Sequence, residues 1–110
     1  MKLVGEKLDP LRTLPWEKSF FFYKGLGQPL GKVASSYQEF ASQIKSVEAS
    51  SLEFHLMRDD FANWFKMLGD SVMQRKLAGL KKKNLKGEEL RKSLVELVES
   101  RLSDLNKSKS

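Results

Sequence analysis

From Ser36 onward the sequence repeats one pattern, in which a residue able to cap a helix precedes apolar residues at helical spacing. The clearest case follows Asp59 and Asp60, where large apolar side chains recur at positions i, i+3, i+4 and i+7: Phe61, Trp64, Phe65 and Leu68. This spacing places the four side chains on one face of a helix, and such a face must be covered by other elements. The pattern therefore predicts a mainly α-helical chain.

The same signals predict further helices on both sides of this one. Residues 36–39 (SYQE) have the pattern of a capping box before a helix that ends near Val47, and residues 50–53 (SSLE) offer a second box. Gly69 and Asp70 end the aromatic helix and begin one that spans about 72–80. A last helix starts near two glutamates and carries a leucine-rich stripe: Leu90, Leu94, Leu97, Val98, Leu102 and Leu105. We expect a small helical bundle of four to five helices.

An aromatic run, residues 20–23 (FFFY), precedes the helices and predicts a short strand or an extended arm. It must pack on the helices, pair with a second chain or be helical itself. Residues 24–32 (KGLGQPLGK) are predicted to form a loop, and their glycine spacing does not match a dinucleotide-binding fingerprint. We divide the chain into three parts: an N-terminal extended segment (1–18), a helical domain (19–106) and a disordered tail (107–110).

Composition limits the classes of function that remain. The chain has 110 residues, enough for one hydrophobic core, and it has no cysteine, which excludes disulfides and thiolate metal sites. No apolar run approaches the roughly 18 residues that a membrane span needs, and the N-terminus does not resemble a signal peptide. We therefore expect a cytoplasmic protein without membrane contact, and we predict no metal and no cofactor.

The single histidine, His55, lies four residues before Asp59, so one helix would place both side chains on the same face. That spacing suits two metal ligands, or a carboxylate that orients an imidazole for acid–base chemistry. A zinc site needs further histidine or cysteine ligands, which the chain lacks, and Asp60 is interpreted as a helix cap. We expect a structural role at the edge of the core and predict no catalytic residue. The candidate secondary polar site comprises His55, Arg58 and Asp59.

Positive charge is concentrated in one window of the chain. The formal net charge is +6, and residues 71–92 hold eight basic side chains against only two glutamates. Exposed cations that converge there would attract phosphates, with an affinity that falls as salt rises. A plain solvated loop and an acidic protein partner are the alternatives. The predicted contact residues for an anionic partner are Arg75, Lys76, Lys81, Lys82, Lys83, Lys86, Arg91 and Lys92.

Three segments in order, GKVASSYQEFASQI, SSLEFHLMRDDFANWFKMLGD and GEELRKSLVELV, resemble a known family. The chain is similar over about residues 20–101 to a prokaryotic family of archaea and bacteria, the domain of unknown function 5752. The resemblance implies a small, mainly helical domain and a prokaryotic source, and it implies no activity. It is carried by Gly31, Ala34, Ser36, Ser51, His55, Arg58, Asp60, Phe61, Trp64, Gly69, Asp70, Leu90 and Arg91.

Together these features predict a non-enzymatic, basic binding module that contacts nucleic acid or the ribosome through its lysine-rich loop. The alternative is a protein-interaction or regulatory module, such as a homodimer through the C-terminal leucines. Both hypotheses assume that the aromatic and leucine side chains meet in one core. The predicted core residues are Trp16, Phe20, Phe22, Phe40, Ile44, Phe54, Phe61, Trp64, Phe65, Leu68, Leu94 and Leu97.

Overall fold

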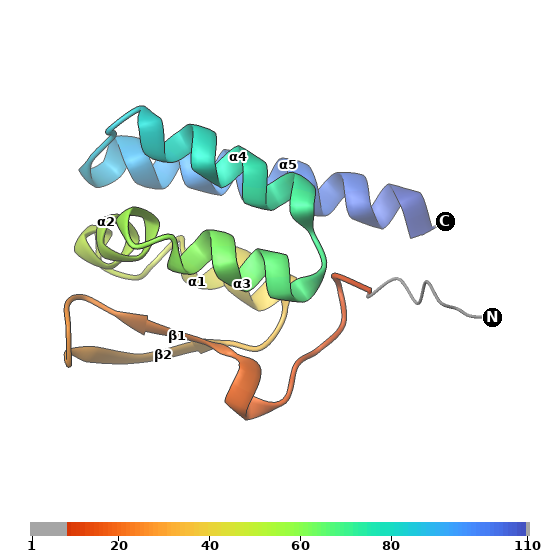
Figure 1. Ribbon diagram of the computed structural model, residues 1–110, viewed down its shortest axis with the longest axis horizontal. Coiled ribbons are helices and arrows are strands. Elements are labelled where there is room, and N and C mark those ends of the chain that lie inside the picture. The colour runs from red at the N-terminus through yellow and green to blue at the C-terminus, as the bar shows by residue number, and fades with distance from the viewer. Residues whose placement is uncertain (1–8, 110) are drawn as a thin grey trace.

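The computed structural model describes residues 9–109, and in them five α-helices and one β-hairpin form three layers (Figure 1). The first layer is α4 (Ser71–Lys82) with α5 (Gly87–Lys109), the middle layer is α1 (Tyr37–Gln43), α2 (Ala49–Met57) and α3 (Asp60–Leu68), and the third is β1 (Phe20–Tyr23) with β2 (Pro29–Ala34). The predicted helical bundle with an aromatic strand is confirmed. Predictions for residues 1–8 and for Ser110 fall outside the described residues.

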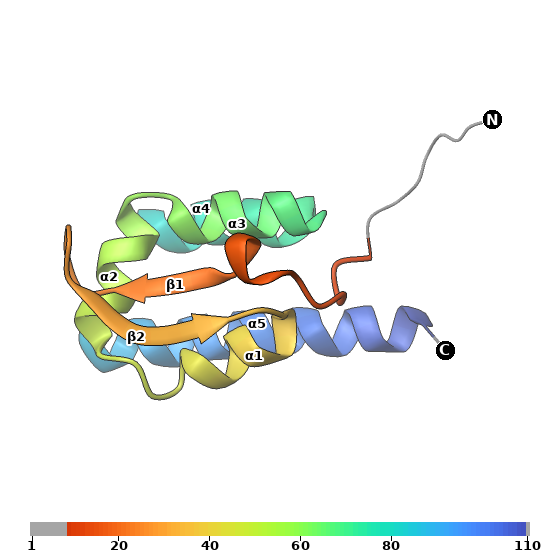
Figure 2. The same cartoon turned by 90° about the horizontal axis from the view of Figure 1, so that it is seen from below.

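The aromatic run pairs within its own chain. β1 and β2 are antiparallel, with Phe20 opposite Ala34, and the register is irregular near the turn. The prediction of a loop over residues 24–32 was therefore partly wrong, because β2 already begins at Pro29. Most of β2 is exposed or half-buried, and its sequence lacks the alternation of apolar and polar residues that predicts a strand. Viewed from below, β1 lies on the α3 side of the hairpin and β2 on the α1 side (Figure 2).

Hydrogen bonds hold the segment before β1 against the helices. Nε1 of Trp64 donates to the carbonyl of Lys18 at 3.0 Å, and Arg12 donates to the carbonyl of Leu68, at the end of α3, at 2.7 Å. Trp16 was predicted in the core and is instead 65% exposed. A short 3₁₀ turn (Trp16–Lys18) leaves its indole on the surface, edge-on to the ring of Phe21 at 5.0 Å.

Two predicted helix caps are confirmed. Oγ of Ser36 accepts from the backbone N–H of Glu39 at 3.1 Å, and Oδ1 of Asp70 accepts from that of Met73 at 3.1 Å. The reciprocal half of the first box differs slightly, because the Glu39 carboxylate accepts from the N–H of Ser35, at 2.7 Å. The bonds to Ser36 and Asp70 each satisfy a donor that the first helical turn leaves without a partner.

Other helix boundaries differ from the sequence prediction. The second capping box is wrong, because α2 begins at Ala49, after an N-cap without a side-chain hydrogen bond. Ser51, assigned to that box, is instead fully buried, and its hydroxyl has no partner among the described residues. α1 ends earlier than predicted, at Gln43, and α5 continues to Lys109.

The core lies between the middle layer and both outer layers. Phe40 illustrates it, because its ring stacks on that of Trp64 with 5.3 Å between centroids. Burying such side chains stabilises the fold by about 1.5–3 kcal/mol each. Phe54 and Leu97 were predicted in the core but are only half-buried, because Phe54 lines a pocket and Leu97 a groove between α4 and α5. The confirmed core residues are Phe20, Phe22, Phe40, Ile44, Phe61, Trp64, Phe65, Leu68 and Leu94.

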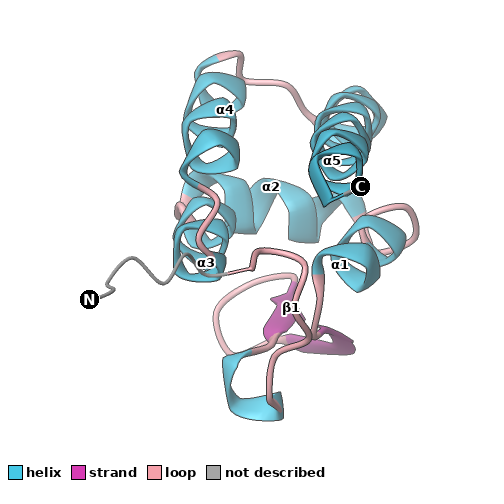
Figure 3. Ribbon diagram, turned by 90° about the vertical axis from the view of Figure 1, so that its right-hand side faces the viewer, coloured by secondary structure: helices cyan, strands magenta, loops and turns pink. Residues whose placement is uncertain are grey.

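One buried carboxylate joins the outer helix layer to α1. Asp70, only 1% exposed, accepts from the hydroxyl of Tyr37 at 3.1 Å and from Nε and Nη2 of Arg101 at 3.0 Å each. Burial alone would raise the pKa of Asp70, but the hydrogen bonds from Arg101 and from the N–H of Met73 hold it below its ordinary value. This carboxylate is fully satisfied and serves the fold. Viewed along the helices, α4 and α5 stand side by side over the middle layer (Figure 3).

Candidate functional site: an aromatic pocket and a basic edge

His55 is buried and uses both ring nitrogens. Nε2 accepts from the backbone N–H of Tyr23, in β1, at 2.8 Å, so this nitrogen carries no proton. Nδ1 lies 2.8 Å from Oδ2 of Asp60 and donates to it. Burial lowers the pKa of His55 below its ordinary value, although the Asp60 carboxylate acts in the opposite direction. His55 is therefore a neutral, fixed link between the hairpin and the helices, as the expected structural role requires.

The partner of His55 is Asp60 and not Asp59, so the predicted i, i+4 pair is wrong. α2 ends at Met57, and Asp59 adopts a left-handed conformation (φ 65°) at the junction, so helical periodicity does not continue to α3. Asp60 is likewise not a helix cap, since its carboxylate binds His55 and Nε of Arg58, the latter at 3.0 Å. Arg58, which the sequence analysis placed in the secondary polar site, thus pairs with this carboxylate.

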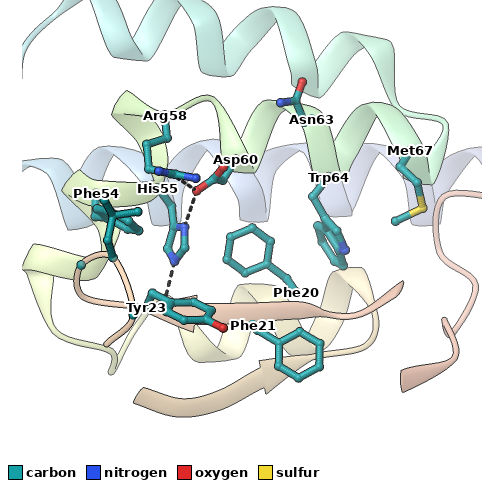
Figure 4. Close-up of a pocket in the computed structure, with 13 residues that line it drawn as sticks. Phe20, Phe21, Tyr23, Phe54, His55, Arg58, Asp60, Asn63, Trp64 and Met67 are labelled. Atoms are coloured by element: carbon teal, nitrogen blue, oxygen red, sulfur yellow. Dashed lines mark hydrogen bonds and ion pairs between the residues drawn. The ribbon is translucent and has the colours of Figure 1, made fainter. Parts of the chain in front are cut away.

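A pocket of about 470 Å³ opens beside this cluster, between β1, the hairpin turn, α2 and α3 (Figure 4). Ring and thioether side chains form most of its wall, and its polar members are His55, Arg58, Asp60 and Asn63. The guanidinium of Arg58 lies over the ring of Phe54, 5.0 Å from its centroid. Pockets of this size and apolar character are typical of small-ligand sites. The apolar wall comprises Phe20, Phe21, Tyr23, Leu26, Phe54, Trp64 and Met67.

Two of the eight predicted contact cations, Lys81 and Arg91, already bind acceptors within the protein. Nζ of Lys81 binds both oxygens of Asp59, at 3.1 and 3.3 Å. Arg91 donates to the Glu88 carboxylate and to the carbonyl of Ile44, at 2.8 Å in both cases. These two are therefore poor candidates for a phosphate contact. The other six are exposed, and none has a carboxylate within ion-pair distance in residues 9–109: Arg75, Lys76, Lys82, Lys83, Lys86 and Lys92.

Five of these six cations form what we call the basic edge: Arg75, Lys76, Lys82, Lys83 and Lys86. α4 contains no acidic residue. Because seven residues make about two helical turns, Lys82 lies above Arg75, and Lys83, the C-cap residue, above Lys76. Lys76 and Lys83 also line one groove between α4 and α5. The α4–α5 loop lies at the same end of the molecule as α2 and the hairpin turn (Figure 1).

Sequence reasoning missed Asp60 and Asn63 as members of the site. Both lie in α3, three residues apart, which places them on one face of that helix. The same spacing that identified the buried stripe would have identified this polar face beside it. The contribution of Tyr23 was not foreseeable, because its backbone N–H reaches His55 through tertiary structure.

The C-terminal leucine stripe is divided between the interior and the surface. Leu90 and Leu94 are buried against the molecule's own helices, whereas Leu97, Leu102 and Leu105 are half-buried on α5. In residues 9–109, no three histidine, aspartate or glutamate side chains cluster in a way that could hold a metal ion. In the same residues, no helix has both the length and the apolar character to cross a lipid bilayer.

Fold and site together define a small helical domain with a hairpin layer, an aromatic pocket and a basic edge. The chain belongs to the family of unknown function DUF5752, whose model matches residues 2–99, so the family resemblance of the sequence is confirmed. No curated protein matches the chain, and no solved structure does.

Proposed function

We propose that the chain is a non-enzymatic binding module that contacts nucleic acid, alone or within a ribonucleoprotein, through the basic edge. One observation carries the proposal: α4 lacks acidic residues, and the cations of the basic edge have no carboxylate partner in residues 9–109. Solvated cations in a row attract phosphates, and counterion release then favours binding. The proposal includes the cytoplasmic location and the prokaryotic source expected from the sequence.

The geometry of His55 supports the non-enzymatic part of this proposal. An acid–base catalyst needs a ring nitrogen that can reach substrate and a pKa near the working pH. Both nitrogens of His55 are engaged within the fold, its side chain is 4% exposed, and burial lowers its pKa. These features support a structural role for the imidazole.

Binding of a fluorescent single-stranded oligonucleotide, measured by anisotropy between about 50 and 200 mM salt, tests the proposal. We expect affinity to fall steeply with salt. The triple variant Lys82→Ala, Lys83→Ala and Lys86→Ala should bind more weakly, and the slope of log affinity against log salt should flatten by about 2, because each lost phosphate contact removes about 0.7.

A matched control removes the same charge elsewhere. Lys18, Lys32 and Lys66 are exposed, lie outside the basic edge and have no carboxylate partner in residues 9–109. Their triple alanine variant should retain most of the affinity and the slope. No binding at the lowest salt, or equal losses in the two triple variants, would contradict the proposal.

Self-association through α5 is the second candidate function. It is favoured by the half-buried leucines Leu97, Leu102 and Leu105, which leave apolar surface on the last helix. Leu90 and Leu94 are buried within the monomer, so fewer leucines of α5 are available for a dimer interface than the sequence suggested. Sedimentation at two protein concentrations separates the cases, because a purely monomeric species excludes the dimer.

A further inference from the structure

We propose that the aromatic pocket binds one unpaired nucleobase of the nucleic acid that the basic edge holds. This inference rests on the proposed function and deepens it, because it assigns the base contact as well as the phosphate contact. It follows from the pocket's walls, from its polar end and from its position.

The walls of the pocket suit a flat ring. Phe21 and Tyr23 come from β1, Phe54 from α2, and Trp64 with Met67 from α3, so the apolar lining has three independent sources (Figure 4). Planar bases stack on aromatic rings whatever their identity, because every base has a π-face. The backbone around the pocket is held in place, because His55 joins Tyr23 of β1 to Asp60 of α3.

The polar end of the pocket offers both hydrogen-bond donors and acceptors. Oδ2 of Asp60 already accepts from His55 and Arg58, which leaves Oδ1 without a partner among the described residues. The side-chain amide of Asn63, also exposed, makes no hydrogen bond to the described residues. A carboxylate oxygen accepts from an exocyclic amino group, and an amide pairs with a donor and an acceptor on a base edge. An aliphatic or phenyl side chain of a peptide would use none of these groups.

The position of the pocket matches that of the basic edge. Asp59, which binds Lys81 of α4, directly precedes Asp60 in the chain. The hairpin turn, α2 and the α4–α5 loop occupy one end of the molecule (Figure 1). A strand whose phosphates contact Lys82 and Lys83 can therefore present a base to the same end. Because the phosphates of such a strand are negatively charged and complement the basic edge, a base carried by a strand is favoured over an aromatic ligand without phosphates.

The test compares an intact single-stranded oligonucleotide with an abasic strand of the same length and phosphate charge. We expect the intact strand to bind about tenfold more tightly, from the stacking of one base. Phe54→Ala, which removes a stacking surface, should remove most of this preference, and Asp60→Asn, which removes only a hydrogen-bond acceptor, should reduce it. Both variants should leave the affinity for the abasic strand unchanged. The triple variant of Lys82, Lys83 and Lys86 should weaken both strands and keep their ratio. Circular dichroism of each variant verifies that it is folded.

The outcomes separate this inference from the proposed function. If intact and abasic strands bind equally well, the base site is excluded and the basic edge stands. If neither strand binds, the basic edge fails, and the inference fails with it.

Free nucleosides test the pocket directly through the fluorescence of Trp64 in a Trp16→Phe background, which leaves one indole. We expect adenosine or cytidine, which carry exocyclic amino groups, to change this signal and to compete with the oligonucleotide. If N-acetylphenylalaninamide changes the signal and no nucleoside does, the pocket recognises a peptide side chain and the inference is wrong.

Discussion

Two aspartates of this chain each bind an arginine, and they differ in how many of their acceptors are used. Asp70 has a side chain with 0% exposure, and its two oxygens accept from a helix N-terminus, a tyrosine and Arg101. Asp60 is 28% exposed, accepts from His55 and Arg58 through one oxygen, and lines a pocket. A carboxylate with every acceptor satisfied holds elements together, whereas one with an open acceptor at a pocket is available to a ligand.

Replacing Asp70 should have the largest effect on stability. Asp70→Ala leaves Arg101 without its partner and removes the cap from the N–H of Met73, so we expect the free energy of unfolding to fall by about 3–5 kcal/mol. Urea denaturation followed by circular dichroism measures it. A loss below about 1 kcal/mol, as for an ordinary surface residue, would show that this cluster does not hold α1, α4 and α5 together.

Replacing His55 should have the next largest effect. His55→Ala leaves the N–H of Tyr23 without its acceptor. It also removes a ring packed against Phe20 and Phe61, whose ring centroids lie 4.7 and 5.5 Å from that of His55. We expect a loss of about 2–4 kcal/mol. Amide hydrogen exchange at Tyr23 should accelerate in this variant. Unchanged protection of that amide would contradict the bond to Nε2.

The single histidine also predicts how stability depends on pH. Burial lowers the pKa of His55 in the folded state. Below about pH 6.5 the unfolded chain therefore binds a proton at His55 that the folded chain does not bind. Stability is thus fully present above that pH and falls as the pH drops towards 5, by at most about 1.4 kcal/mol per pH unit.

A His55→Asn variant should lose this slope, because the chain has no other histidine to titrate in the range. Denaturation midpoints at pH 7, 6 and 5 decide the matter. Equal slopes in the variant and the parent protein would mean that His55 is not buried in its neutral form.

Asp60→Ala should cost less than the same change at Asp70. It leaves the Nδ1–H of His55, whose side chain is 4% exposed, without its acceptor. We therefore expect the free energy of unfolding to fall by about 1–2 kcal/mol. The matched experiment is Asp70→Ala, measured under identical conditions. If the two losses were equal, the distinction between a structural and a ligand-accessible carboxylate would have no energetic basis.

Lys81→Ala should have the smallest effect. Its pair with Asp59 is largely solvated, with side-chain exposures of 32% and 54%, and such pairs contribute at most about 0.5–1 kcal/mol. Chemical denaturation should give a small difference in low salt that shrinks in high salt, because salt screens exposed charges. A large, salt-independent loss would show that the α2–α3 junction depends on this contact.

Most of the helical architecture was accessible from the sequence, because it depends on local signals. Ser36 and Asp70 cap helices where the sequence predicted, and the stripe of α3 is buried. β2 was not accessible, because its partner strand and the covering helices, rather than its own apolar pattern, make it a strand. The prediction that Trp16 lies in the core was wrong, because the 3₁₀ turn at Trp16–Lys18 leaves that indole on the surface.

The candidate site was predictable only in part. The sequence identified His55 and Arg58 but paired the histidine with Asp59, because helical spacing was extended across a junction that the left-handed backbone of Asp59 interrupts. It also identified all eight cations of the window, but could not show that Lys81 and Arg91 are held by partners in other elements. Pairing across elements is a tertiary property, and no spacing rule encodes it.

The central claim is that a ligand contacts the basic edge and the pocket beside Asp60. It does not contact the buried cluster around Asp70. A ¹H–¹⁵N correlation spectrum titrated with a single-stranded oligonucleotide tests it most directly. We predict that the backbone amides of residues 82–86 and the side-chain amide of Asn63 shift together, while the amide of Met73 and Nε–H of Arg101 stay in place. Shifts at Met73 and Arg101, with none at Asn63, would contradict the account.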